Sequence, residues 1–142
     1  MKYDDASWHY GGEFPKDLPH EAGATHIGMY VAWCALNGMV GELMAGDFAD
    51  DLEQLRKREV TPGAWFLNTC DGKFTNEELN DEGNAFTTDY YAEELATFVV
   101  HYEETLGQGR PSIYHVPDTW QSYDLLAPVI SQQYQAWKQL GH

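Results

Sequence analysis

Apolar residues recur at helical spacing in two long segments of the chain. In "DYYAEELATFVVHYEETLG", residues 89–107, apolar side chains fall every three or four positions, and Gly107 closes the segment. Glycine commonly follows the last turn of a helix, so this pattern predicts an amphipathic helix that ends there. A second stripe with the same spacing lies near the C-terminus, at Tyr123, Ala127, Ile130, Tyr134 and Trp137. Each stripe predicts a helix with one buried face.

The segment "THIGMYVAWCALNGMVG", residues 25–41, is apolar on more than one helical face and carries no Asp, Glu, Lys or Arg. With 17 residues and several polar or glycine positions it is a poor membrane span. It predicts a buried central helix, which we expect to start near Asp17 as N-cap. His26 lies in this apolar run, so we expect a hydrogen-bonded core histidine rather than a metal ligand.

Capping residues predict where the other helices begin. Asp47, Thr61 and Thr119 precede helical patterns, with Asp118 as an alternative cap for the last helix, and "TNEE" at residues 75–78 fits a capping box. Residues 112–116 are β-prone. We therefore predict a mainly α fold with about five or six helices in a single domain spanning residues 1–142. A small β element formed by the N-terminal segment and residues 112–116 is compatible with this pattern.

The net charge of the chain limits the classes of molecule that we expect it to bind. The chain has 8 Lys and Arg against 23 Asp and Glu, a formal net charge of −15. Residues 71–104 hold ten acids and one lysine, and so carry −9 of that charge. Nucleic acids and anionic membranes attract basic surfaces, so we expect neither as a partner. The two cysteines, Cys34 and Cys70, are expected to be reduced, which favours a cytoplasmic location.

The concentrated acidity leads to the first functional hypothesis, an acidic binding module. Complementary charge speeds association and selects partners. By analogy with other small acidic proteins, we expect an immunity or antitoxin-like protein that masks a basic protein partner. The residues predicted to contact that partner are Glu77, Glu78, Asp81, Glu82, Glu93 and Glu94. The same acids would serve solubility if no such partner exists.

The alternative is a metal-dependent hydrolase or small-ligand enzyme with a His/Asp cluster. Its candidate catalytic residues are Asp4, Asp5, His9, His115 and Asp118. Carboxylates and imidazoles are the groups that bind metals or transfer protons near neutral pH. Nothing in the spacing forces these segments together, and His20 and His26 are six residues apart instead of the four typical of zinc helices. The sequence alone therefore assigns no metal site and no cofactor.

Three stretches resemble a family of small bacterial proteins for which no activity is established. They are "KYDDASWHYGGEFPKDLP", residues 2–19, "TPGAWFLNTCDGKFTNEELNDEGNAF", residues 61–86, and "PSIYHVPDTWQSYDLLAPVI", residues 111–130. The resemblance implies a bacterial, cytoplasmic protein of one domain. It implies no catalytic residue.

Overall fold

A buried helix lies at the centre of the fold. The computed structural model describes residues 2–9, 14–92 and 97–141. Helix α1 (Thr25–Leu36) is buried along nearly its whole length, as its apolar composition predicts. It does not start at Asp17: the chain first forms a 3-10 turn, η2 (His20–Ala24), whose N-cap position is Pro19. Asp17 instead lies 3.0 Å from His115 through its Oδ2 atom.

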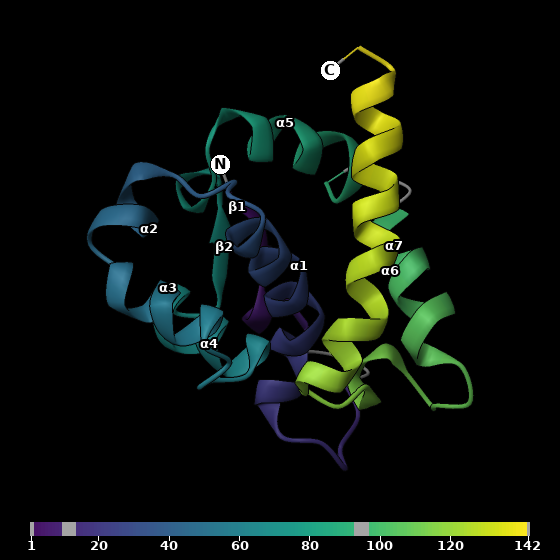
Figure 1. The fold of residues 1–142 in the computed structure, drawn as a ribbon. Helices are drawn as coiled ribbons and strands as arrows, with labels where there is room; N and C mark the ends of the chain where they lie inside the picture. The colour runs from purple at the N-terminus through teal and green to yellow at the C-terminus, as the bar shows by residue number, and fades with distance from the viewer. Residues whose placement is uncertain (1, 10–13, 93–96, 142) are drawn as a thin grey trace.

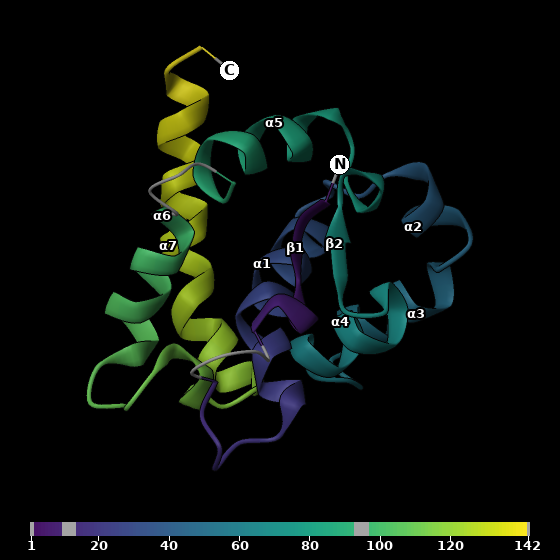
Figure 2. The same ribbon diagram turned by 180° about the vertical axis from the view of Figure 1, so that it is seen from behind.

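The other helices surround α1 on two sides (Figures 1 and 2). On one side lie α2, α3 and α4, and on the other lie α6, a π-helical turn η4 and the long helix α7, while α5 lies across one end. Their bounds are α2 (Glu42–Gly46), α3 (Ala49–Arg56), α4 (Pro62–Cys70), α5 (Asp81–Tyr90), α6 (Thr97–Tyr102), η4 (Glu103–Gly107) and α7 (Trp120–Gln139). The mainly α prediction is confirmed. Among the described residues, none of these helices is both long and apolar enough to cross a membrane.

A small antiparallel sheet joins β1 (Lys2–Asp5) to β2 (Lys73–Thr75), so the predicted β element exists with a different second strand. The two strands lie side by side in Figure 2. Residues 112–116 are not a strand, because Ile113–His115 forms a 3-10 turn, η5, whose cap is the Ser112 hydroxyl. β2 follows α4 directly, through a turn in which Asp71 and Gly72 have φ angles of 56° and 73°.

Side-chain caps begin α4, α5 and α7 among the described helices, and three predictions of caps are confirmed. Thr61 caps α4, Thr119 caps α7, and Thr75 forms a capping box with Glu78. Asp47 does not cap α3, whose N-cap position is Phe48. The predicted helix over 89–107 is also wrong as one element, because α5 already ends at Tyr90 and α6 begins at Thr97.

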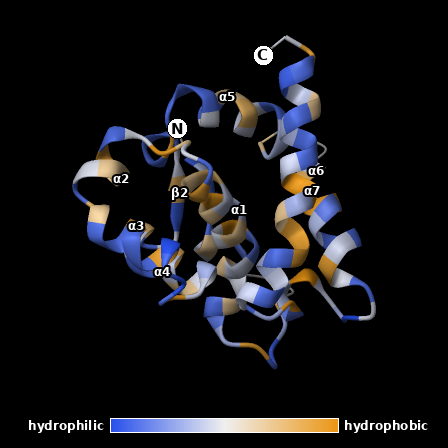
Figure 3. Cartoon of the chain, viewed as in Figure 1, coloured by the Kyte–Doolittle hydropathy of each residue, from blue (hydrophilic) through white to orange (hydrophobic). Residues whose placement is uncertain are grey.

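Aromatic side chains fill the core between α1 and its neighbours. Tyr30 of α1 packs against the rings of Phe74, Phe86, Tyr91 and Phe98, with centroids 4.8 to 6.5 Å apart. Figure 3 shows the same division by hydropathy, with α1 largely apolar and blue segments on the peripheral helices. Large rings that interlock in this way hold their neighbours rigidly, because well-packed interiors leave few voids. The polar cluster described next is built against this core.

Candidate metal centre at the N-terminal strand

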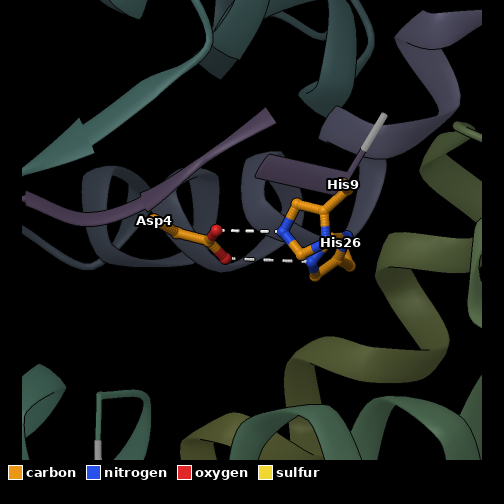
Figure 4. A group of neighbouring side chains, drawn as sticks. All are labelled: Asp4, His9 and His26. Carbon is orange, nitrogen blue, oxygen red and sulfur yellow. Dashed lines mark hydrogen bonds and ion pairs between the residues drawn. The ribbon is translucent and has the colours of Figure 1, made fainter. Parts of the chain in front are cut away.

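Three side chains from three elements meet next to the core (Figure 4). Asp4 lies on β1, His9 ends the 3-10 turn η1 (Ala6–His9), and His26 is the second residue of α1. Asp4 Oδ1 lies 2.9 Å from His9 Nε2, and Asp4 Oδ2 lies 3.9 Å from His26 Nε2. One nitrogen or oxygen atom from each residue lies within 4.8 Å of the other two, which is close enough to share one metal ion.

A tight turn after β1 returns His9 to Asp4. The backbone N–H of Ala6 donates to the carbonyl of Gly72 at 2.8 Å, which fixes the end of the strand against the turn before β2. Asp5 Oδ1 then accepts from the N–H and hydroxyl of Ser7 at 2.9 and 2.8 Å. Successive strand residues point to opposite faces, so Asp4 and Asp5 diverge. Asp5 pairs with Lys2 at 2.8 Å. The prediction that Asp5 belongs to the His/Asp cluster is therefore wrong.

The Asp4 carboxylate is buried and holds several hydrogen bonds. It accepts from the Tyr91 hydroxyl at 2.6 Å and from the Asp5 N–H at 2.8 Å, besides facing His9. Burial raises the pKa of Asp4, but the hydrogen bonds from His9 and Tyr91 and the proximity of both imidazoles outweigh it, so the net shift is downward. Asp4 is therefore an anion at neutral pH, the form in which a carboxylate binds a metal.

His26 is buried and has no hydrogen-bond partner for either ring nitrogen among the described residues. The prediction of a core histidine is right about burial and wrong about hydrogen bonding. Burial, with a smaller contribution from His9, lowers the pKa of His26 to about 4, although Asp4 opposes this shift. The ring is neutral at pH 7, and an unpaired buried polar group costs about 1–3 kcal/mol. Polar atoms at this depth are nearly always satisfied, so the site calls for a partner at His26.

The groups around the cluster hold its side chains in place. His9 Nδ1 lies 2.8 Å from the Tyr114 hydroxyl, so both nitrogens of His9 have a partner. The His9 and His26 rings meet edge to face with centroids 4.6 Å apart. Metal-binding histidines usually form a hydrogen bond through the nitrogen that does not bind the metal, and metal-binding carboxylates are themselves hydrogen-bonded. Tyr114 and Tyr91 occupy these two supporting positions.

The other candidate catalytic residues lie outside this cluster. His115 contacts Asp17 through Nε2 at 3.0 Å and Ser112 through Nδ1 at 2.8 Å. Asp118 accepts from the Thr61 hydroxyl at 2.6 Å and the Gly63 N–H at 2.8 Å, at the start of α4. Of the five residues proposed from sequence, the structure thus brings together Asp4 and His9, and it adds His26.

The predicted partner-binding acids are divided between structural contacts and free exposure. Glu78 accepts from the Thr75 N–H and hydroxyl at 2.9 and 2.8 Å, and Glu82 contacts Lys138 at 2.8 Å. Glu77 and Asp81 are exposed. Glu93 and Glu94 lie outside the described residues. The basic protein partner stays a prediction, and four of its six contact residues can be placed on the structure.

A family comparison covers most of the chain, including the cluster. A family described as "Domain of unknown function (DUF7832)" matches residues 2–116. The chain belongs to this family. The DUF7832 match contains Asp4, His9 and His26 together with Tyr91 and Tyr114, and it ends before α7. No curated protein and no solved structure matches the chain.

Proposed function

We propose that Asp4, His9 and His26 bind one divalent transition-metal ion, and that the chain is a metal-dependent hydrolase. The observation that carries the proposal is His26, whose two ring nitrogens are buried and unpartnered while its Nε2 faces the Asp4 carboxylate. A metal ion between these groups would give His26 Nε2 a bond, while Nδ1 would keep no hydrogen bond among the described residues. It also offsets the cost of burying a carboxylate, because the ion supplies the opposite charge.

The distances fit a metal ion after a small adjustment. Two ligands of a tetrahedral Zn²⁺ site lie about 3.3 Å apart when each bond is about 2.0–2.2 Å long. The Asp4–His9 and Asp4–His26 separations of 2.9 and 3.9 Å lie on either side of that value. These two separations end on different Asp4 oxygens, and one ligand atom from each of the three residues lies within 4.8 Å of the other two, so the side chains must rotate toward one another to bind one ion.

An acid–base pair without a metal fits the geometry less well. A general base needs one nitrogen free to face the substrate, whereas His9 Nδ1 is bonded to Tyr114 and its Nε2 to Asp4. That interpretation also gives no role to His26. The metal centre explains all three residues together with the hydrogen bonds from Tyr91 and Tyr114.

Three protein ligands favour a catalytic site over a structural one. Structural zinc sites usually have four protein ligands, while catalytic sites have three and keep a position for water. The His9 side chain is 21% exposed, so water reaches the cluster from its side. A metal ion in this site supplies Lewis-acid chemistry and lowers the pKa of bound water. Asp4 and the two imidazoles then fix its position against the rigid aromatic core.

The first experiment is metal binding by the full chain after treatment with a chelator. We expect one equivalent of Zn²⁺ by calorimetry, and a Co²⁺ spectrum with the visible absorption of a low-coordinate nitrogen and oxygen site. His26→Gln should weaken Zn²⁺ binding by about 100-fold or more. His20→Gln is the matched control, because His20 is exposed and lies outside the cluster.

Substoichiometric binding, or equal binding by wild type and His26→Gln, would overturn the metal centre. If His26→Gln does not fold, the imidazole ¹⁵N signals of the wild type during a Zn²⁺ titration decide instead: His9 and His26 must shift together. Hydrolysis is tested separately with p-nitrophenyl acetate, a generic probe of activated water. A metal-loaded protein no faster than the metal-free protein would remove the hydrolase assignment.

A further inference from the structure

We propose that a pocket beside the metal centre, separated from it by Tyr114, recognises one end of the substrate, and that this end is an amine attached to an apolar group. The inference rests on the proposed function. The pocket has a volume of about 440 Å³ and lies between η2, the start of α4 and the segment after η5. This volume is within the range of small-molecule sites, which are about 300–1,000 Å³.

Tyr114 places the pocket next to the cluster. It lines the pocket, and its hydroxyl lies 2.8 Å from His9 Nδ1. Its ring also lies 5.7 Å from the His9 ring and 5.9 Å from the His26 ring, between centroids. Thr25, another lining residue, directly precedes His26. One aromatic side chain therefore separates the pocket from the proposed metal ligands and contacts both.

The walls of the pocket are mostly apolar. They include Leu18, Ala22, Leu67, Val116 and Pro117. Such a surface gains about 25 cal/mol for each Å² of apolar ligand area that it removes from water. The pocket therefore favours a substrate with a hydrocarbon or aromatic group, and the polar lining residues determine the rest of its chemistry.

Those polar residues select against anions. The described lining contains the carboxylates Glu21 and Asp118 and no lysine or arginine. It also contains His115, whose Nε2 lies 3.0 Å from Asp17 Oδ2 and whose Nδ1 lies 2.8 Å from Ser112 Oγ, so both of its nitrogens already have a partner. Asp118 is occupied by the start of α4, and a Cβ on Gly63 would lie 2.7 Å from its Oδ2, so this wall is closely fitted. Glu21 is exposed and has no hydrogen bond or ion pair within the described residues. Glu21 is thus the carboxylate available to a cationic ligand at the pocket rim.

The net charge of the chain acts in the same direction. A charge of −15 repels anions and attracts cations before contact. A carboxylate or phosphate substrate would meet Glu21 and Asp118 with no cationic side chain from the described lining to pair with it. An amine that carries an apolar group can bury that group against the apolar walls and pair its charge with Glu21.

The test uses 2-phenylethylamine as the probe and 3-phenylpropionate as a matched anion of similar size. Binding to the metal-free full chain is measured by NMR titration. We expect saturable shifts at residues of the pocket with the amine and at least tenfold weaker binding of the carboxylate. Glu21→Gln should weaken amine binding about fivefold to tenfold, the usual size of one partly exposed charged contact. Glu42→Gln, an exposed glutamate on α2, serves as the control.

The same titration on the Co²⁺-loaded protein tests whether pocket and centre are linked. We expect the amine to change the Co²⁺ spectrum in wild type and to change it less in Tyr114→Phe, which lacks the hydroxyl that contacts His9. Absent amine binding, or equal binding of the carboxylate, overturns the substrate class. Amine binding that leaves the Co²⁺ spectrum unchanged overturns the link to the centre. Failure of Co²⁺ itself to bind overturns the proposed function, and is seen before any amine is added.

Discussion

The N-terminal cluster and the acidic segment 71–104 differ in whether their buried polar groups have hydrogen-bond partners. The acidic segment carries −9, yet its partly buried acid, Glu78, is satisfied by Thr75, and Glu82 is paired with Lys138 and Tyr134. The cluster contains a single carboxylate and two imidazoles, yet it leaves His26 buried without a hydrogen bond among the described residues. The acids described in this segment are therefore either paired or exposed to water, whereas the buried His26 ring has no hydrogen bond among the described residues.

This difference shows which observation points to function. Exposed acids cost little to maintain, because water solvates them, and so their number says little about a site. A buried imidazole without a partner costs about 1–3 kcal/mol, and folds keep such groups mostly where a ligand or reaction uses them. The cluster rather than the acidic segment is thus the stronger candidate, and the predictions below test this contrast.

The largest effect is expected from Asp4→Asn in the metal-free protein. The change removes the charge that faces His9 and His26 and places an amide N–H₂ against donors, including the buried Tyr91 hydroxyl. Each hydrogen bond to a charged acceptor contributes about 1.5–3 kcal/mol, and the variant weakens those from Tyr91 and His9, so we expect a loss of about 3 kcal/mol or more. Urea unfolding measures it, with Asp81→Asn in the acidic segment as control, for which we expect less than about 1 kcal/mol. Equal losses in the free energy of unfolding of the two variants would mean that Asp4 contributes no more to stability than an exposed acid of the segment.

Metal addition should give the next largest effect. At a free Zn²⁺ concentration 100 times the dissociation constant, binding to the folded state raises the free energy of unfolding by about 2.7 kcal/mol. Urea unfolding with Zn²⁺ and then with excess chelator measures the gain and its reversal. His20→Gln should keep the gain and His26→Gln should lose it. A gain that survives His26→Gln would place the metal elsewhere in the chain.

Sequence reasoning identified the helical character of the fold and the caps at Thr61, Thr75 and Thr119, because both depend on local patterns, but it was wrong about Asp17 and Asp47. The apolar run of α1, the Thr61 cap and the Thr75–Glu78 capping box are contained in windows of a few residues. The strand pairing was missed for the same reason. β1 and β2 are separated by about 70 positions along the chain, and no local pattern specifies such a partner.

The sequence predicted two of the three residues of the cluster. Asp4 and His9 were proposed together with Asp5, His115 and Asp118, as groups that can bind a metal or transfer protons. His26 was assigned to the core because it sits in an apolar run, and it is indeed buried. What the sequence could not show is that Asp4 of β1 would be its nearest charged neighbour while no hydrogen bond would reach it. The available signal was the presence of three histidines and three aspartates within the first 26 residues.

A smaller effect is expected in the acidic segment from Glu78→Ala. The Glu78 carboxylate accepts from the Thr75 N–H and hydroxyl, so alanine leaves that N–H without its partner. Loss of such a cap costs about 1 kcal/mol. Glu78→Gln is the matched control, since glutamine also serves in capping boxes, and it should be nearly neutral. A loss as large as that of Asp4→Asn would mean that this segment, too, depends on one buried acid.

The smallest effect concerns the pKa values of two acids in this segment, Glu78 and Glu82. Burial raises the pKa of Glu78 above its ordinary value of 4.5, against the opposing hydrogen bonds from Thr75. The hydrogen bonds from Lys138 and Tyr134 lower the pKa of Glu82 below the same value. Glu82 therefore stabilises the fold above its unfolded-state pKa, and this contribution is lost as the pH falls through its lower folded value.

Glu78 has the opposite sign. Because its folded pKa is the higher one, the folded state binds its proton more readily, and Glu78 favours folding more as the pH falls through that value. Carboxyl ¹³C titration by NMR should show the midpoint of Glu78 above, and that of Glu82 below, the ordinary glutamate value of 4.5. Lys138→Met should raise the pKa of Glu82 and leave the pKa of Glu78 unchanged, because Lys138 contacts Glu82. Identical midpoints for Glu78 and Glu82 would mean that water solvates both acids equally, and would contradict the local pairing that distinguishes this segment from the cluster.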